Sequence, residues 1–559
     1  MRKYWLRHLL FALFGMVALP VLGQDGVGAA RTNTSLPEAS GIQEKTSGEN
    51  SALVRIERFE ITGNTLLDAA LLERLLAPYK GDNRSYTDIQ LALETLEGAY
   101  RNAGYSAVHV IIPEQEITGG TVTFKVVETV VDKVILKGSQ YYDENNIRNA
   151  LPALVEGSTP SALKLSENIR LANENPTRQI DVVLAMGDKE NTVDAKVNVQ
   201  DSSPRKVFVT LDNTGSSSTG MYRAGVGFQH NNLFNRDHAA TFNYVTSPGH
   251  VNEVKQFSVS YRLPFYALGD SLDMIAARSD SNAGTSPVVG GFMLTFSGKG
   301  SVYGMHYNHY LPRSGDYTSR VVTGLDYRAY YNNCTLAGVA CPGVPDLTLR
   351  PFSISYAGTQ TKPSQITDFS ASIVHNVSGG ARGGAATFNL ARAGAKAEYS
   401  LLRFNGSLAG ALPQDWQYRL AGNFQFTYDA LVSYESFGLA GANAVRGFTE
   451  REVSNDKGAV LNLELYTPEL ASQLHLEDSS FRLLGFVDRG RGWKVTLPGE
   501  AMTWDSIGSA GVGFRYTRGK NVTLKFDLAR VTGVGGTLCG CVSTKVGNTR
   551  GELGLAANW

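Results

Sequence analysis

The sequence predicts an all-β transmembrane barrel of 16 antiparallel strands preceded by two small α/β domains. From residue 204 to the C-terminus, segments of about ten residues alternate apolar and polar side chains, and their connections are alternately short and long. Residues 53–203 instead show the order β-α-α-β-β twice, as a degenerate repeat of about 75 residues. The chain also ends on an aromatic residue of the apolar face, Trp559.

Length and composition agree with this division. The chain has 559 residues, too many for one compact domain, with 52 basic and 52 acidic residues. A neutral chain gives no reason to expect nucleic acid as a partner. After the N-terminus no run of 18 apolar residues occurs, which excludes membrane-spanning helices. The 59 Gly, 25 Tyr and 24 Phe suit short strands, tight turns and aromatic belts.

Residues 1–23 have the order of a secretory signal peptide. Arg2, Lys3 and Arg7 form a basic start, and an apolar stretch over 9–19 precedes small or modest residues. The alternative, a membrane anchor, needs a longer apolar stretch. Residues 24–52 are rich in Gly, Ser, Thr, Asn and Glu without apolar periodicity, so we expect a flexible linker.

The first α/β unit is expected over residues 53–128 and the second over 129–203. In the first, a strand stops at the turn dipeptide Gly63-Asn64, and Ser85 with Asp88 has the spacing of a helix capping box. The strands are expected at 54–61, 106–112 and 122–126 in the first unit, and at 134–138, 179–185 and 192–199 in the second, with helices from 85 to 104, around 144–154 and around 164–172.

Residues 204–559 carry the barrel pattern. In one segment Leu461, Leu463 and Leu465 oppose Asn462 and Glu464. A soluble sandwich also alternates in this way. The persistence of the pattern without a helix signal, the even number of segments and the aromatic end favour a membrane barrel. Charges keep to one face because a charge on the lipid face costs roughly 2–4 kcal/mol at mid-bilayer.

The long, outward connections hold all four cysteines. These connections are expected near 213–219, 248–253, 280–291, 333–346, 378–394, 433–457, 490–505 and 533–548. Cys334 and Cys341 fall in the fourth, and Cys539 and Cys541 in the eighth, where an oxidising exterior lets disulfides persist. Cys334–Cys341 is a plausible clip, whereas a Cys539–Cys541 bridge is strained, so cross-pairing stays open. The nine His are scattered, so no metal site is expected.

No motif of catalysis or cofactor binding is present. Gly298-Lys299 is followed by Gly300, without the Ser or Thr of a phosphate-binding loop. There is no nucleophile elbow and no paired metal motif. We therefore expect neither an enzyme nor a cofactor, and no nucleotide hydrolysis by this chain.

Nearly everything after residue 53 resembles one family, the two-partner-secretion outer-membrane transporters (the TpsB family). The markers are Gly63-Asn64, Gly104-Tyr105, Pro113-Glu114-Gln115, Asn175-Pro176, Leu211-Asp212-Asn213-Thr214-Gly215, Thr219-Gly220, Asn232-Leu233-Phe234, Val445-Arg446-Gly447-Phe448 and Phe486-Val487-Asp488-Arg489-Gly490. The resemblance implies two periplasmic POTRA domains and a sixteen-stranded barrel in the outer membrane.

The resemblance further implies that the sixth long loop folds back into the barrel, with Arg446 paired to Asp488 on the inner wall. The alternation agrees, since Leu483 and Val487 lie on the apolar face and Phe486 and Asp488 on the other. A guanidinium matches a carboxylate with two parallel hydrogen bonds. The alternative is a surface-loop arginine and a solvated aspartate.

Two features depart from the family. The family usually has paired Gly and a Ser or Thr before Val-Arg-Gly, whereas this chain has Gly441-Ala442-Asn443-Ala444. Many members carry an N-terminal helix that plugs the pore, and residues 36–45 offer only a weak candidate.

The resemblance implies export of one large partner protein, recognised unfolded by the POTRA domains. That partner would be a secreted β-helical haemolysin, adhesin, haem-acquisition protein or toxin, and outer-membrane lipid would surround the barrel. The main alternative is a factor that inserts other barrel proteins, which usually has three or more POTRA units. A diffusion porin would lack the α/β repeat, and an adhesin would need longer outer loops.

Overall fold

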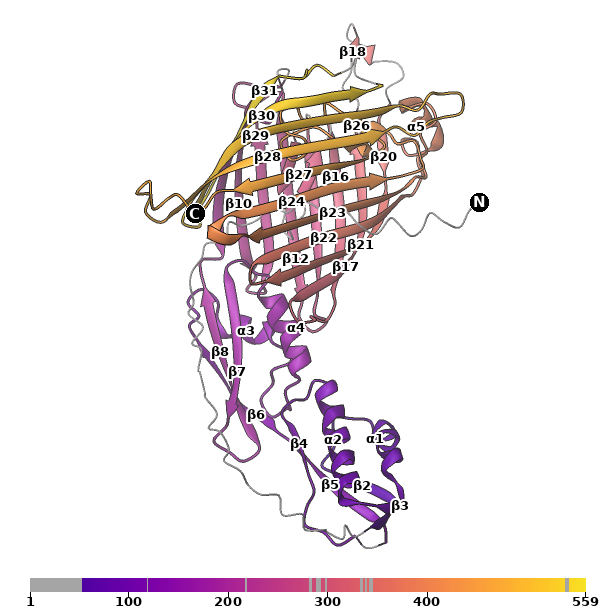
Figure 1. The fold of residues 1–559 in the computed structure, drawn as a ribbon, viewed down its shortest axis with the longest axis vertical. Helices are drawn as coiled ribbons and strands as arrows, with labels where there is room; N and C mark the ends of the chain where they lie inside the picture. Colours follow the sequence, from indigo (N-terminus) through magenta and orange to yellow (C-terminus); the bar gives the residue numbers. More distant parts are fainter. Residues whose placement is uncertain are drawn as a thin grey trace. The chain divides into compact units, whose positions relative to one another are not determined.

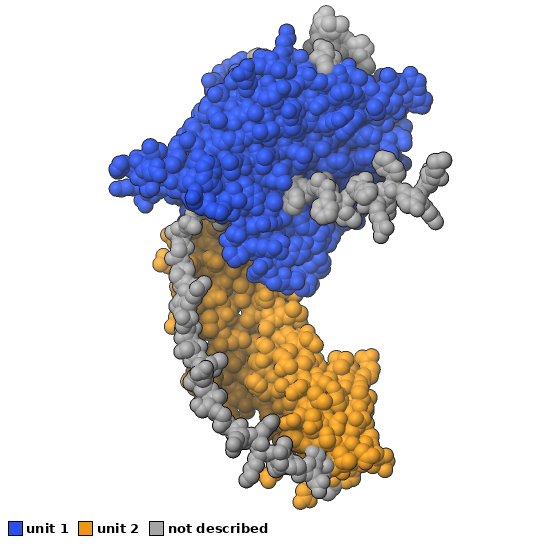
Figure 2. Space-filling model, in the orientation of Figure 1, with its two compact units in different colours: residues 1–22, 203–559 blue, residues 23–202 orange. Residues whose placement is uncertain are grey.

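The computed structural model describes residues 53–117, 119–216, 219–280, 284–287, 293–296, 299–331, 335–336, 339–340, 345–537 and 542–559. The described residues up to 202 form one compact unit, and those from 203 onward form another (Figure 2). No helix in these ranges is long and apolar enough to cross a membrane. The expected signal peptide and linker lie outside the described residues, as do all four cysteines.

The first α/β domain packs two helices on a three-stranded sheet. Its elements are β1 (Val54–Ile56), β2 (Arg58–Thr62), α1 (Ala69–Leu76), η1 (Ala77–Tyr79), β3 (Gly81–Arg84), α2 (Tyr86–Asn102), β4 (Val108–Ile111) and β5 (Thr121–Glu128). The sheet order is β2-β5-β4, with β2 parallel to β5. The expected capping box is present, since the Ser85 N–H donates to Asp88 at 2.7 Å and the Asp88 N–H donates to the Ser85 hydroxyl at 3.3 Å.

The strand expected over 54–61 is two strands, so that expectation was wrong. Ile56 and Phe59 are both buried although they stand three residues apart, so one alternating strand cannot bury both. The chain changes phase at Glu57, whose N–H donates to the carbonyl of Gly120 at 2.7 Å. As a result β1 pairs with β3, and β2 with β5.

The second α/β domain has the same topology. Its elements are β6 (Val130–Lys137), α3 (Glu144–Ala150), α4 (Ala162–Ala172), β7 (Arg178–Met186) and β8 (Thr192–Asp201), in a sheet of order β6-β8-β7 with β6 parallel to β8. Helix α3 ends before residue 154 because Leu151 precedes Pro152, and the residue before a proline is disfavoured in helical geometry.

One glycine recurs at the same place in both domains. Gly63 directly follows β2 and Gly138 directly follows β6, with positive φ values of 79° and 90°. A Cβ on either would lie 2.4 or 2.3 Å from a carbonyl oxygen of the central strand, that of Val126 or Val199. Both conformation and space therefore require glycine.

The second unit is a closed barrel of sixteen antiparallel strands among the described residues (Figure 1). The strands are β9 (Arg205–Asp212), β10 (Arg223–Leu233), β11 (His238–Thr246), β12 (Lys255–Phe265), β13 (Asp270–Ser279), β16 (Gly300–Tyr310), β17 (Tyr317–Tyr330), β20 (Leu347–Leu349) with β21 (Pro351–Lys362), β22 (Gln365–Asn376), β23 (Ser400–Ala411), β24 (Gln417–Phe426), β27 (Lys457–Tyr466), β28 (Ser479–Trp493), β29 (Trp504–Arg518), β30 (Val522–Gly536) and β31 (Thr549–Asn558). β20 and β21 both pair with β17 and count as one strand. Pairing of β31 with β9 closes the ring.

The barrel is apolar outside and polar inside. Leu463 and Val512 are 52% and 61% exposed, whereas Asp488 is fully buried, with 0% exposed. A soluble protein would reverse this arrangement, whereas lipid requires it.

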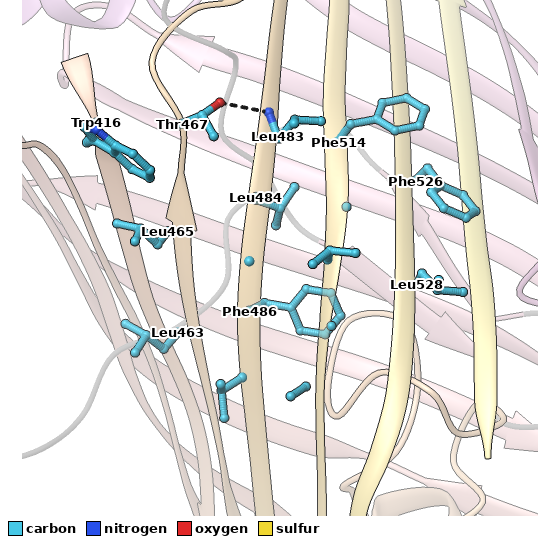
Figure 3. A pocket seen from close by; sticks show the side chains of 16 residues that line it. Trp416, Leu463, Leu465, Thr467, Leu483, Leu484, Phe486, Phe514, Phe526 and Leu528 are labelled. Atoms are coloured by element: carbon cyan, nitrogen blue, oxygen red, sulfur yellow. Dashed lines mark hydrogen bonds between the residues drawn. The ribbon is translucent and has the colours of Figure 1, made fainter. Parts of the chain in front are cut away.

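A shallow apolar hollow of about 820 Å³ lies on the outer wall over β27 to β30 (Figure 3). It forms around Gly485, where a Cβ would meet no atom within 4 Å, and Leu463, Leu483 and Phe514 are among its lining residues. Phe486, whose ring centre lies 3.5 Å from the Arg446 guanidinium carbon, is also among the lining residues.

Short elements occur in the connections. They are β14 (Gly284–Pro287), β15 (Met293–Phe296), β18 (Thr335–Leu336), β19 (Val339–Ala340), β25 (Phe437–Gly438), β26 (Ser454–Asn455), η2 (Pro413–Asp415), η3 (Ser433–Glu435) and α5 (Ala385–Ala391). Helix α5 contradicts the expectation that no helix follows residue 204. It lies in the fifth long connection, where burial of Phe388 stabilises a helix too short to show a periodic signal.

Candidate functional site: the sixth loop

The sixth long loop, residues 427–456, joins β24 to β27 and turns tightly at its tip. The Gly441 N–H donates to the Val445 carbonyl at 3.1 Å, and the Ala444 N–H to the Gly441 carbonyl at 3.0 Å. Gly441 has a φ of +134°, and a Cβ there would lie 2.4 Å from the Glu450 carboxylate. That carboxylate accepts the Ala442 N–H at 2.8 Å. The tip of this chain thus keeps one obligatory glycine and places alanine next to it.

Arg446 follows the tip and points into the barrel wall. Its Nε and Nη2 donate to the two carboxylate oxygens of Asp488, each at 2.8 Å. Its Nη1 donates to Glu464 at 2.8 Å. The guanidinium carbon lies 3.5 Å from the centre of the Phe486 ring. The expected pairing of Arg446 with Asp488 is therefore present in the structure, in the two-pronged geometry that lysine cannot form.

Asp488 is surrounded by donors. Besides the guanidinium it accepts the Arg446 backbone N–H at 3.1 Å, the Asn462 amide at 2.8 Å and the Ser509 hydroxyl at 3.3 Å. Asn462 also donates to the carbonyl of Ala444 at 2.7 Å, so it joins wall and loop. Within the described ranges, Arg446 is the only cation within 4.0 Å of Asp488.

The charged contacts of the loop tip extend over β27 to β30. Glu464 also accepts Arg419 at 3.3 Å, and Asp527 binds Arg515 at 2.7 Å and Arg446 at 3.4 Å. Alternation along the sequence places Glu464 on the inner face, but neither Glu464 nor Asp527 was expected in the site. The sequence does contain a signal for these two residues, because each is a carboxylate at an inward position of a strand close to the Arg446–Asp488 pair.

The other motif residues pack the loop against the wall. Val445 and Phe448 are 0% and 1% exposed, in a cluster with Val460, Ile507 and Val531 of the wall. Each apolar side chain buried there stabilises docking by about 1.5–3 kcal/mol.

Two glycines give the loop room to dock. Gly447 has a φ of +90°, and its N–H donates to Glu552 at 3.3 Å. A Cβ on Gly490 would lie 3.0 Å from the Val445 side chain, so this glycine of the Phe486–Gly490 motif leaves space for the tip.

Two further buried carboxylates, Glu435 and Asp456, hold the limbs of the loop through ion pairs, and neither was predicted from the sequence. Glu435, 1% exposed, accepts Arg328 of β17 and Arg403 of β23, each at 2.8 Å. Asp456, 0% exposed, accepts both terminal nitrogens of Arg392 in the fifth loop at 2.5 and 2.9 Å. The loop is therefore anchored at its first limb, its tip and its last limb.

The arrangement holds a segment of the chain inside the barrel. The buried cations and carboxylates are committed to one another. Among the residues described, no group of three or more His, Cys, Asp or Glu is placed to hold a metal ion.

Comparisons with known proteins identify the family to which the chain belongs. The model of the haemolysin secretion/activation protein family ShlB/FhaC/HecB matches residues 192–516, and that of the ShlB-type POTRA domain matches residues 54–129. The outer membrane transporter CdiB of Escherichia coli is 21% identical over 445 residues, which cover 76% of this chain and 70% of CdiB. The heme/hemopexin transporter protein HuxB of Haemophilus influenzae (strain 86-028NP) is 26% identical over 164 residues, 29% of each chain.

Solved structures show the shared fold. CdiB from Escherichia coli superposes with a TM-score of 0.68 at 18% identity, over 93% of both chains. CdiB from Acinetobacter baumannii gives 0.63 at 16% identity, over 91% of both. The family match also favours secretion over the assembly-factor alternative. With a matching barrel, a matching POTRA domain and a docked sixth loop, this chain belongs to the haemolysin secretion/activation protein family ShlB/FhaC/HecB, the two-partner-secretion transporters whose barrel lies in the outer membrane and whose POTRA domains lie in the periplasm.

Proposed function

We propose that this protein exports one large, β-helical partner protein, which the POTRA domains bind in unfolded form and the barrel conducts when the sixth loop withdraws. The observation that carries the proposal is the docking of Arg446 against Asp488 and Glu464 inside the barrel. One similar transporter is named for its cargo, since HuxB is a heme/hemopexin transporter protein. The partner of this chain is expected to be of the same broad kind, a secreted toxin, adhesin, haemolysin or haem-acquisition protein.

The anchors of the loop suit a gate because all of them are reversible. Each is an ion pair, a hydrogen bond or an apolar contact, so withdrawal breaks no covalent bond and no strand pairing of the barrel. The loop can leave while the ring of strands stays closed. The buried charges favour the docked state, since a buried charge without its partner is strongly destabilising.

The place where the POTRA domains bind the unfolded partner is proposed to be the free edge of β7. An extended segment can add to a sheet edge through main-chain hydrogen bonds, which tolerate varied sequences. At Ile180 this edge is capped, since the Asn173 amide accepts the Ile180 N–H at 2.6 Å and donates to its carbonyl at 2.9 Å. Ile180 therefore directs its polar groups away from β8, and by alternation Val182 and Leu184 do so too.

The other edges offer less room. On β4, the Val110 N–H donates to the Glu97 carboxylate at 3.2 Å. On β6, the Val131 N–H donates to Ser158, and its carbonyl accepts Gly157 at 2.7 Å. β1 already pairs with β3, which leaves β2 as the rival edge. The open part of β7, from Val182 to Met186, is therefore the proposed binding edge.

A proline at Leu184 tests this step. Proline removes one N–H, and here that N–H points away from β8, so the sheet keeps its own hydrogen bonds. We expect Leu184→Pro to insert normally and to secrete little of the partner, which is expected to be encoded beside this gene. The matched control is Lys196→Pro on the central strand β8, which should disrupt the domain itself, as hydrogen exchange would report.

The outcomes separate the steps. Full secretion by Leu184→Pro, with the strand intact by hydrogen exchange, would exclude β7 as the binding edge. Failure of the unmodified protein to secrete any partner would refute export itself. Cross-linking probes on β2 would then show whether the partner uses that edge instead.

A further inference from the structure

The inner face of β21 to β24 differs from the wall that holds the sixth loop. Outward side chains there are apolar, and Ile354 and Ile373 are 49% and 64% exposed. A row of inward positions across these strands carries short neutral polar side chains. Strand register places Ser355 beside Ser372, Ser370 beside Asn405, and Asn405 beside Asn423. We call these five residues the serine–asparagine track.

The track is electrically neutral. Arg403 lies beside Ser372, but its charge is balanced by Glu435 at 2.8 Å. Asp368, two residues before Ser370, accepts the hydroxyl of Thr359 at 2.7 Å. The wall of β27 to β30, in contrast, carries the charges that bind Arg446.

The two walls also differ in exposure. Asn405 is exposed and the other track residues are half-buried, whereas Glu464 and Asp488, on the charged wall of β27 to β30, are buried. The track therefore presents its hydroxyl and amide groups to the lumen. The charged wall uses its groups to hold the loop.

We propose that the unfolded partner, in extended form, slides along the serine–asparagine track during export. The inference rests on the proposed function and adds where in the lumen the partner runs. Hydroxyl and amide side chains both donate and accept hydrogen bonds, so they can replace water around any main-chain segment. The uncharged side chains of the track neither retain nor repel charged side chains, which a fixed charge in a narrow passage would do.

A photo-cross-linking amino acid placed in the full-length transporter tests the path. The probes stand at Ser355 and Ser372, and the matched controls stand one residue earlier or later, at Ile354 and Ile373, where the side chain faces lipid. The cargo is the secreted partner fused to a disulfide-closed domain that stalls it in the barrel. We expect cross-links from the two serine positions and none above background from the two isoleucine positions.

The path is wrong if the stalled partner is captured at inward positions of β27 to β30, such as Ser509, and not at Ser355 or Ser372. Failure of the unmodified transporter to secrete the partner would instead refute the proposed function. The two failures are therefore distinguishable.

Charge on the track gives a second test, with potassium and chloride as the probes. Ser355→Arg with Ser372→Arg should make the channel in a planar bilayer more anion-selective and should abolish secretion. Ser372→Thr, which keeps the hydroxyl, should change neither. Heat-modifiable gel migration confirms that the barrel is closed. A closed double-arginine barrel with normal selectivity and normal secretion would overturn the inference.

Discussion

Replacing Arg446 by alanine should release the sixth loop while leaving the barrel inserted. The side chain makes three charged hydrogen bonds of 2.8 Å, two to Asp488 and one to Glu464, and all three groups are buried. Removing one member of a buried ion pair costs about 3–5 kcal/mol, because the partner charge is left uncompensated. The docked state should therefore lose roughly 100- to 4,000-fold in population, at about 1.4 kcal/mol for each factor of ten.

Secretion of the partner and single-channel conductance measure the effect. We expect Arg446→Ala to insert, to show larger and more frequent openings and to secrete poorly, because the loop no longer returns to its seat. Arg446→Lys keeps the charge and loses the second prong, so it should be intermediate.

Arg482→Ala is the matched control. Arg482 is an inward arginine of β28, the strand that carries Asp488, and it binds Asp415 and Glu469 instead of the loop. Arg482→Ala should therefore behave like the unmodified protein. Unchanged conductance together with full secretion by Arg446→Ala would refute the assignment of the loop as a gate.

Three further predictions concern other parts of the chain. Asp456→Asn should raise the frequency of channel openings, because it breaks the buried pair with Arg392, at a cost of about 3–5 kcal/mol; equal opening rates in a planar bilayer would argue that this limb stays in place. Gly138→Ala should destabilise the second POTRA domain by about 1–2 kcal/mol through its positive φ, with more from the contact with a carbonyl, and hydrogen exchange of β6 and β8 should quicken while the barrel is unaffected. Hydrogen bonds from Ser85 lower the pKa of Asp88 below its ordinary value of 3.8, so the stability that Asp88 adds to α2 is present above that value and is lost as the pH falls through the lower folded pKa. Pepsin cleavage within α2 should therefore rise steeply in strong acid, and Asp88→Asn should flatten that dependence.

Alternation and one motif pair were enough to predict the barrel and the centre of its site. A wall strand has a period of two, so the residue order of β28 alone places Phe486 and Asp488 on the inward face. Arg446 and Asp488 could be paired only through the family resemblance, because spacing along the chain does not show which inward groups meet.

The ion pairs of Glu435 and Asp456 could not be predicted in the same way. Glu435 meets Arg328 and Arg403, which lie on strands far from it in sequence, and inward arginines occur on many strands. Strand register and the path of the loop decide which of them it reaches. The break between β1 and β2, in contrast, could be predicted from the sequence, because the change of phase between Ile56 and Phe59 is visible there.

Among the described residues, Arg446 is the one cation that pairs with Asp488. This pairing has a consequence for how the sixth loop would return after export. If Arg446 leaves during export, as proposed, the wall is left with an unbalanced carboxylate at Asp488. After the partner has been exported, the same charge imbalance favours the return of the Arg446 guanidinium to Asp488. Under the proposed mechanism, reclosure then lowers the free energy and requires no nucleotide hydrolysis.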